Sequence, residues 1–71
     1  MTTTEKLEEI IRNSGLKKGF LAEKLGISRA GLNNCINNKA EFRASQIFTL
    51  CELLRIEEKD RTDIFFSQFG A

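Results

Sequence analysis

The chain has 71 residues, enough for one domain (residues 1–71) but not for a second hydrophobic core. Proline is absent, phenylalanine is the only aromatic residue, and 41% of residues are hydrophobic, which suits a small helical domain. Two cysteines without histidine exclude the usual four-ligand zinc site and histidine-dependent nucleophilic catalysis. We therefore expect a protein that is not an enzyme and carries no metal or cofactor. No apolar run is long enough for a membrane span or a signal peptide, so we expect a cytoplasmic protein without membrane association.

The net charge of +1 is divided unevenly along the chain. Residues 12–43 carry seven basic and two acidic side chains, a net charge of +5, whereas residues 1–11 and 44–71 each sum to −2. A basic middle between acidic ends fits an electrostatic footprint for nucleic acid. The alternative is a solvated face whose charges cluster by chance.

The first predicted helix follows Thr4, a plausible N-cap, and ends near residues 13–15. Leu7, Ile10 and Ile11 form its apolar stripe. A second, short helix starts after Lys17, carries Phe20, Leu21 and Leu25 as apolar positions, and stops at Gly26, a residue suited to a left-handed C-terminal position.

A third helix is predicted over about residues 29–37, with Ser28 as its N-cap. Its apolar positions Leu32, Cys35 and Ile36 have the i, i+3, i+4 spacing of a core face. Only Gly26 and Ile27 separate Ser28 from the preceding helix, so residues 17–37 form a helix-turn-helix candidate.

The clearest amphipathic signal predicts a fourth helix over about residues 44–54, and its apolar positions are Ile47, Leu50, Cys51 and Leu54. A last short helix carries Ile64, Phe65 and Phe66, of which we assign the first two mainly to the core. Both cysteines fall on apolar stripes, which favours two buried thiols over a disulfide.

The segments LAEKLGISRAGLNNCINNK and IFTLCELLRI, followed by a Phe-Phe pair, resemble the phage repressor and Cro type of helix-turn-helix domain. The likeness extends over roughly residues 16–66 and is strongest to short phage-encoded members. It implies an all-α fold, a small five-helix bundle of the lambda-repressor-like type. It also implies a sequence-specific regulator of a phage or prophage genetic switch that occludes a promoter.

In that family the second helix of the pair reads bases in the major groove. By position, the resemblance implies base contacts from Arg29, Ala30, Asn33 and Asn34. Arginine can bind the O6 and N7 atoms of guanine, asparagine can bind adenine, and alanine can contact a thymine methyl group. Each of these residues could also be an ordinary solvent-facing helix residue.

Two predicted helices begin at cations, Lys17 and Arg43, where family members usually have Ser or Thr. A lost cap costs about 0.5–2 kcal/mol, and a cation there also opposes the helix dipole. A DNA phosphate would remove both penalties, since it accepts the free N–H groups and neutralises the cation. We therefore expect phosphate contacts from Lys17, Lys18, Asn37, Asn38, Lys39 and Arg43; the alternative is a tolerated poor cap on a frayed helix.

Two further positions depart from the family pattern, and both predict modest stability of the fold. Gly19 lies inside a predicted helix, at a cost of about 1 kcal/mol relative to alanine. Arg55 occupies a position after the fourth helix where glycine commonly closes the helix.

The expected partner is double-stranded operator DNA, bound by a homodimer on a near-palindromic site, as the resemblance implies. Phe66 and Phe69 are the candidate self-association residues. The competing hypothesis is a protein-binding modulator or antirepressor that sequesters a partner phage repressor. The basic middle favours DNA, because a protein partner does not require phosphate-facing cations.

Overall fold

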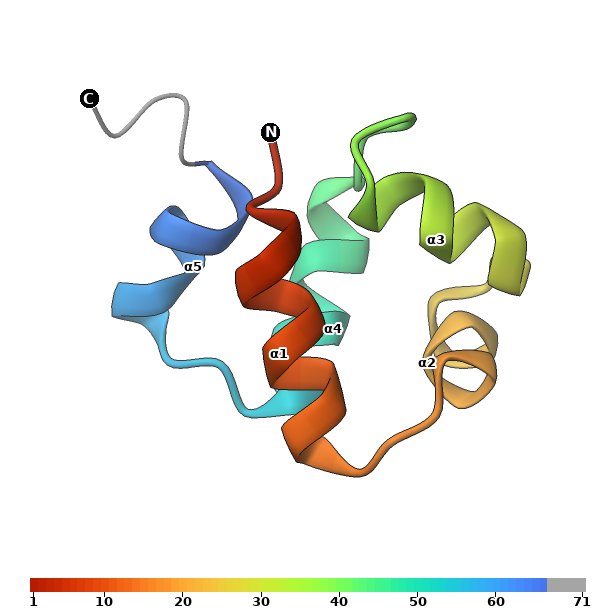
Figure 1. Ribbon diagram of the computed structural model, residues 1–71, viewed down its shortest axis with the longest axis horizontal. Helices are drawn as coiled ribbons and strands as arrows, with labels where there is room; N and C mark the ends of the chain where they lie inside the picture. The colour runs from red at the N-terminus through yellow and green to blue at the C-terminus, as the bar shows by residue number, and fades with distance from the viewer. Residues whose placement is uncertain (67–71) are drawn as a thin grey trace.

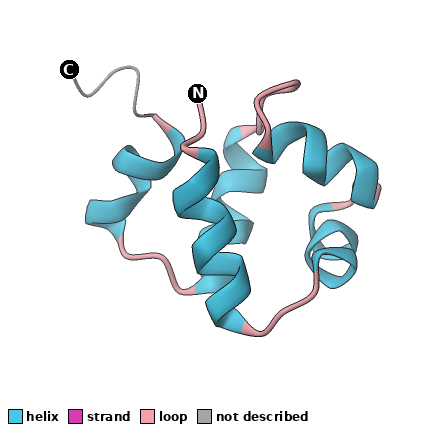
Figure 2. Ribbon diagram, in the orientation of Figure 1, coloured by secondary structure: helices cyan, strands magenta, loops and turns pink. Residues whose placement is uncertain are grey.

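The computed structural model describes residues 1–66, which fold into five helices with no strand between them (Figures 1 and 2). The α1 and α4 helices cross the middle of the molecule, α5 lies at one side, and α2 and α3 lie at the other (Figure 1). This arrangement confirms the predicted all-α five-helix fold. None of these helices is long and apolar enough to cross a membrane. Their bounds are α1 Thr4–Ser14, α2 Lys18–Leu25, α3 Arg29–Ile36, α4 Ala44–Leu54 and α5 Glu58–Phe65.

The residue types at the helix ends explain where most of the helices stop. Gly15 and Gly26 close α1 and α2 in the left-handed region, with φ of 76° and 73°, as their positions in the sequence predict. Arg55 closes α4 with φ of 56°, a conformation that an L side chain adopts at a cost. At the start of α1 the prediction was wrong by one residue, because Thr3 is the N-cap and Thr4 is the first helical residue.

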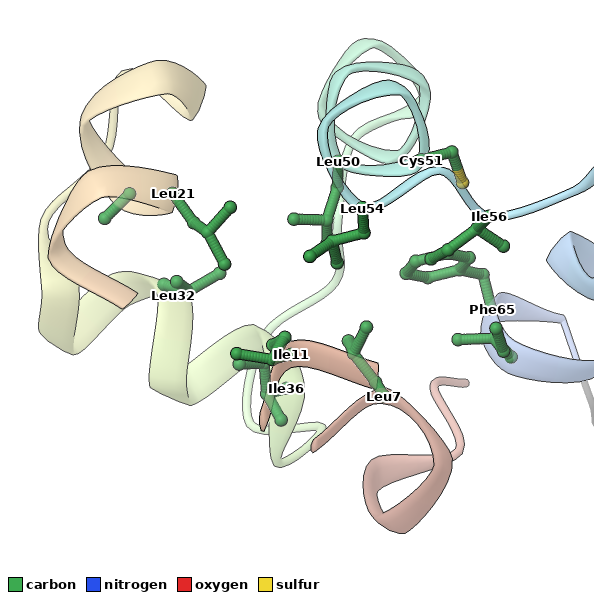
Figure 3. Packing of buried hydrophobic residues seen from close by; sticks show 12 residues of the cluster. Leu7, Ile11, Leu21, Leu32, Ile36, Leu50, Cys51, Leu54, Ile56 and Phe65 are labelled. Carbon is green, nitrogen blue, oxygen red and sulfur yellow. The ribbon is translucent and has the colours of Figure 1, made fainter. Parts of the chain in front are cut away.

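One hydrophobic core joins all five helices (Figure 3). Leu21 of α2 and Leu32 of α3 face each other inside it, and Ala22 is buried as the small residue in α2. Ile64 and Phe65 also lie in the core, which confirms their assignment. The other members are Leu7, Ile11, Ile36, Leu50, Cys51, Leu54 and Ile56.

Phe20 does not lie on the predicted apolar face of α2, whereas Phe66 is exposed and was not assigned to the core. Phe20 is 40% exposed, because Leu21 and Ala22 take the buried face of α2 and leave the preceding position outside. Phe66 is the residue after α5 and is also 40% exposed, so α5 ends one residue earlier than predicted.

Residues at the N-terminus tie the ends of two other helices together. The Thr3 backbone N–H donates to the Ile64 carbonyl at 2.6 Å, and the Thr4 hydroxyl donates to the Ile36 carbonyl at 2.7 Å. The start of α1 is therefore bonded both to α5 and to the last residue of α3.

Candidate nucleic-acid interface

The α2 and α3 helices form a helix-turn-helix pair whose turn is held by backbone hydrogen bonds. The Gly26 and Ile27 N–H groups donate to carbonyls at the end of α2, and Gly31 N–H donates to the Ser28 hydroxyl oxygen at 2.9 Å. Ser28 is therefore the N-cap of α3, as predicted. A Cβ atom on Gly31 would lie 3.2 Å from that oxygen, which gives a local reason for glycine here.

The outward side of α3 carries the four residues predicted to contact bases. Arg29, Ala30 and Asn34 are exposed, and Asn33 is half-buried. Residues four apart share one side of a helix, so Arg29 lies beside Asn33, and Ala30 beside Asn34. The opposite side of α3, formed by Leu32, Cys35 and Ile36, is buried. The four side chains therefore form one accessible strip on a helix held firmly by its other face.

The start of α2 is a cationic hollow on the surface. Lys17 is the N-cap, its side chain makes no capping hydrogen bond, and the residue is exposed. Lys17, Lys18 and Arg29 line the hollow together with the exposed ring of Phe20. Positive charge from three side chains and the uncapped N–H groups of α2 therefore gathers within one concavity.

Lys18 is nevertheless bonded within the protein. Its ammonium nitrogen lies 2.9 Å from Oε1 and 3.1 Å from Oε2 of Glu8 on α1. Both side chains are partly buried, with 24% and 32% of their surfaces exposed. Sequence reasoning missed Glu8, because no local pattern sets the angle between α1 and α2.

The start of α4 has a second uncapped cation. Arg43 is the exposed N-cap of α4 and its side chain makes no capping hydrogen bond. Its backbone N–H instead donates to Oε1 of Gln46 at 2.9 Å. Glutamine three residues after an N-cap is a recognised signal in sequence, so this contact could have been predicted.

Three exposed polar residues follow α3: Asn37, Asn38 and Lys39. The Asn37 side chain donates to the Asn33 carbonyl at 2.9 Å, and the Asn38 side chain makes several contacts within the protein. The Asn38 side chain accepts from the Thr2 backbone N–H at 2.7 Å and donates to the Thr2 carbonyl at 2.8 Å. Its φ of 65° lies in the left-handed region, which asparagine tolerates better than most residues. The amide nitrogen also donates to the Thr4 hydroxyl oxygen at 3.5 Å. Both of its N–H groups are therefore used within the protein, so we leave Asn38 out of the phosphate-binding set below.

The two thiols are free and buried, as predicted. Burial raises the pKa of Cys35, to which Glu41 adds, and burial also raises the pKa of Cys51 against an opposing effect of Arg61. Both thiols therefore stay protonated near neutral pH and are poor nucleophiles. Within residues 1–66, no cluster of three or more His, Cys, Asp or Glu side chains could hold a metal ion.

A protein-family model for the Cro/C1-type helix-turn-helix DNA-binding domain matches residues 6–60. The chain belongs to this family. Searches of curated proteins and of solved structures gave no match. Family membership makes the chain a Cro-like helix-turn-helix domain and supports a DNA-binding transcription regulator. The helix pair of this Cro/C1-type domain comprises α2 and α3, with the cationic hollow at the start of α2.

Proposed function

We propose that this Cro/C1-type domain is a sequence-specific repressor of a phage or prophage genetic switch and acts in the cytoplasm by occluding a promoter. Its α3 helix enters the major groove of operator DNA. The observation that carries the proposal is the accessible strip of α3, whose first residue, Arg29, lines one hollow with Lys17 and Lys18 at the start of α2. The phage setting is supported by the likeness of residues 16–66 to short phage-encoded regulators.

Base recognition is assigned to the outward strip of α3. Arg29 is placed to bind guanine through O6 and N7, and Asn34 to bind adenine through N6 and N7. Ala30 supplies an apolar contact for a thymine methyl group, and Asn33, which is half-buried, reaches bases from the side of the strip. Loss of a bidentate contact should cost about 1–3 kcal/mol of discrimination at one base pair.

Phosphate binding is assigned to the uncapped helix starts and to the end of α3. At Lys17 and Arg43 a phosphate oxygen would accept the free N–H groups and neutralise the cation at the same time. Lys18, Asn37 and Lys39 complete the set. These contacts fix the position of α3 on the duplex without reading its sequence.

Self-association is assigned to the surface around Phe66. This exposed ring lines a small hollow with Met1, Phe42 and Ile47, next to the end of α5. Two copies joined here would place two α3 helices on one near-palindromic operator. Phe69, the other residue predicted for this contact, lies outside the described residues.

Sedimentation of the Phe66→Ser variant tests this contact. We expect it to be monomeric at concentrations where the unchanged protein is dimeric, while Phe48→Ser, an exposed aromatic change on α4, leaves the dimer intact. Loss of the dimer in the Phe48 variant alone would move the interface to α4.

DNA binding is tested by fluorescence anisotropy with the purified protein and a labelled duplex between 50 and 200 mM salt. Lys17→Gln and Arg43→Gln should each reduce the salt slope by about 0.9, whereas Lys59→Gln on α5 should leave it unchanged. Unchanged slopes in both variants would refute the phosphate assignment. If the protein alone bound no duplex but formed a complex with a repressor, the protein-binding modulator would replace the repressor as the function.

A further inference from the structure

The ion pair between Glu8 and Lys18 is the shortest and least exposed of the three in residues 1–66. The Lys6–Asp63 pair is longer, 3.8 Å, with more than half of each side chain exposed, and the Lys59–Glu57 pair is more exposed still. Partly buried charges are screened less by salt and water than exposed ones. Glu8 therefore holds Lys18 more firmly than a surface ion pair holds its lysine.

This pair lies where the proposed function needs positive charge. Lys18 lines the cationic hollow with Lys17 and Arg29, and it is the first residue of α2. Lys17 is exposed and takes part in no ion pair within residues 1–66. Of the two lysines at this helix start, one is free to meet a phosphate and the other is already neutralised.

We propose that Glu8 competes with DNA phosphates for the Lys18 ammonium group and thereby limits the affinity of the domain for DNA. A phosphate that binds Lys18 must displace the carboxylate or approach it as a like charge. Both outcomes weaken binding to any duplex, irrespective of its sequence, since phosphate contacts carry no sequence information. Glu8 therefore lowers non-specific binding and leaves base readout by α3 unchanged.

The inference rests on the proposed DNA-binding function and is tested with two matched variants of α1. Glu8→Gln removes the competing charge, while Glu9→Gln removes the same charge from an exposed neighbour that forms no ion pair within residues 1–66. Anisotropy with a labelled duplex of random sequence gives the affinity of each variant as a function of salt. Circular dichroism at 222 nm checks that both variants are folded at the assay temperature.

We expect Glu8→Gln to bind at least about threefold more tightly than Glu9→Gln at 50 mM salt, with a salt slope steeper by about 0.9 because one more phosphate is neutralised. With that difference in slope, the ratio of the affinity of Glu8→Gln to that of Glu9→Gln should fall about 3.5-fold between 50 and 200 mM salt. In a Lys18→Gln background, Glu8→Gln and Glu9→Gln should bind equally. A merely structural role for Glu8 would not change the slope in this Lys18-dependent way.

Equal binding by Glu8→Gln and Glu9→Gln would overturn the inference while the proposed function stood. Weaker binding by Glu8→Gln would also overturn it, because Glu8 would then orient Lys18 toward the phosphate instead of withholding it. Absence of duplex binding by the unchanged protein would be a failure of the proposed function itself, and it is visible before any variant is compared.

Discussion

Replacement of Asn38 by alanine should lower the free energy of unfolding by about 2–3 kcal/mol. The side chain makes two hydrogen bonds to the backbone of Thr2, a residue only 8% exposed, and their loss should cost about 0.5–1 kcal/mol each. Alanine must also adopt the left-handed φ of 65°, at a further cost of about 1 kcal/mol. The change therefore loosens the N-terminus from the end of α3 and strains the backbone at once.

Urea unfolding followed by circular dichroism at 222 nm measures this loss, and Asn38→Gly separates its two parts. Glycine accepts the left-handed backbone, so it should lose only the hydrogen bonds, about 1–2 kcal/mol. Asn37→Ala is the matched control on an exposed neighbour and should cost less than about 1 kcal/mol, since it removes a single exposed hydrogen bond to Asn33. If Asn38→Ala matched the unchanged protein to within about 0.5 kcal/mol, the bonds to Thr2 would not hold in solution.

Three other predictions concern backbone conformation and the thiols. Arg55→Gly should raise the free energy of unfolding by about 0.5–1 kcal/mol in urea titrations, because φ of 56° suits glycine; a loss of stability would contradict this. Gly19→Ala should raise the thermal midpoint by about 4 °C, since helical alanine is favoured by up to about 1 kcal/mol and the added Cβ would meet no atom of another element within 4 Å; an unchanged midpoint would contradict it. Cys35 and Cys51 should react with a thiol reagent at pH 7 only as fast as the protein unfolds, and rapid labelling would contradict their burial and raised pKa.

Most of the fold could be predicted because its signals are local. Glycine at residues 15 and 26 marked two helix ends, and the spacing of Ile47, Leu50 and Leu54 placed α4 within its observed bounds, Ala44–Leu54. Exposure of Phe20 could not be read from its hydrophobicity. On so short a helix, small differences in orientation decide which of two adjacent apolar residues is buried.

The accessibility of most candidate site residues could be predicted from the sequence, but their contacts within the protein could not. Spacing along α3 was enough to predict that Ala30 and Asn34, four residues apart, share one accessible side. The bonds from Asn38 to Thr2, 36 positions away, and from Lys18 to Glu8 on another helix leave no pattern in the sequence. These bonds depend on how the helices pack. Residues that were predicted alike as phosphate contacts therefore differ in the hydrogen bonds and ion pairs that they already make within the protein.

Selection of bound sequences from a random duplex pool, done in parallel with the unchanged protein and with Asn34→Ala, tests the central claim that α3 reads operator DNA. We predict that the unchanged protein enriches one near-palindromic motif. The Asn34 variant should keep the same salt slope and lose its preference at one position in each half-site, by about 1–3 kcal/mol. An identical motif from both proteins, or no enriched motif from either, would contradict readout by α3.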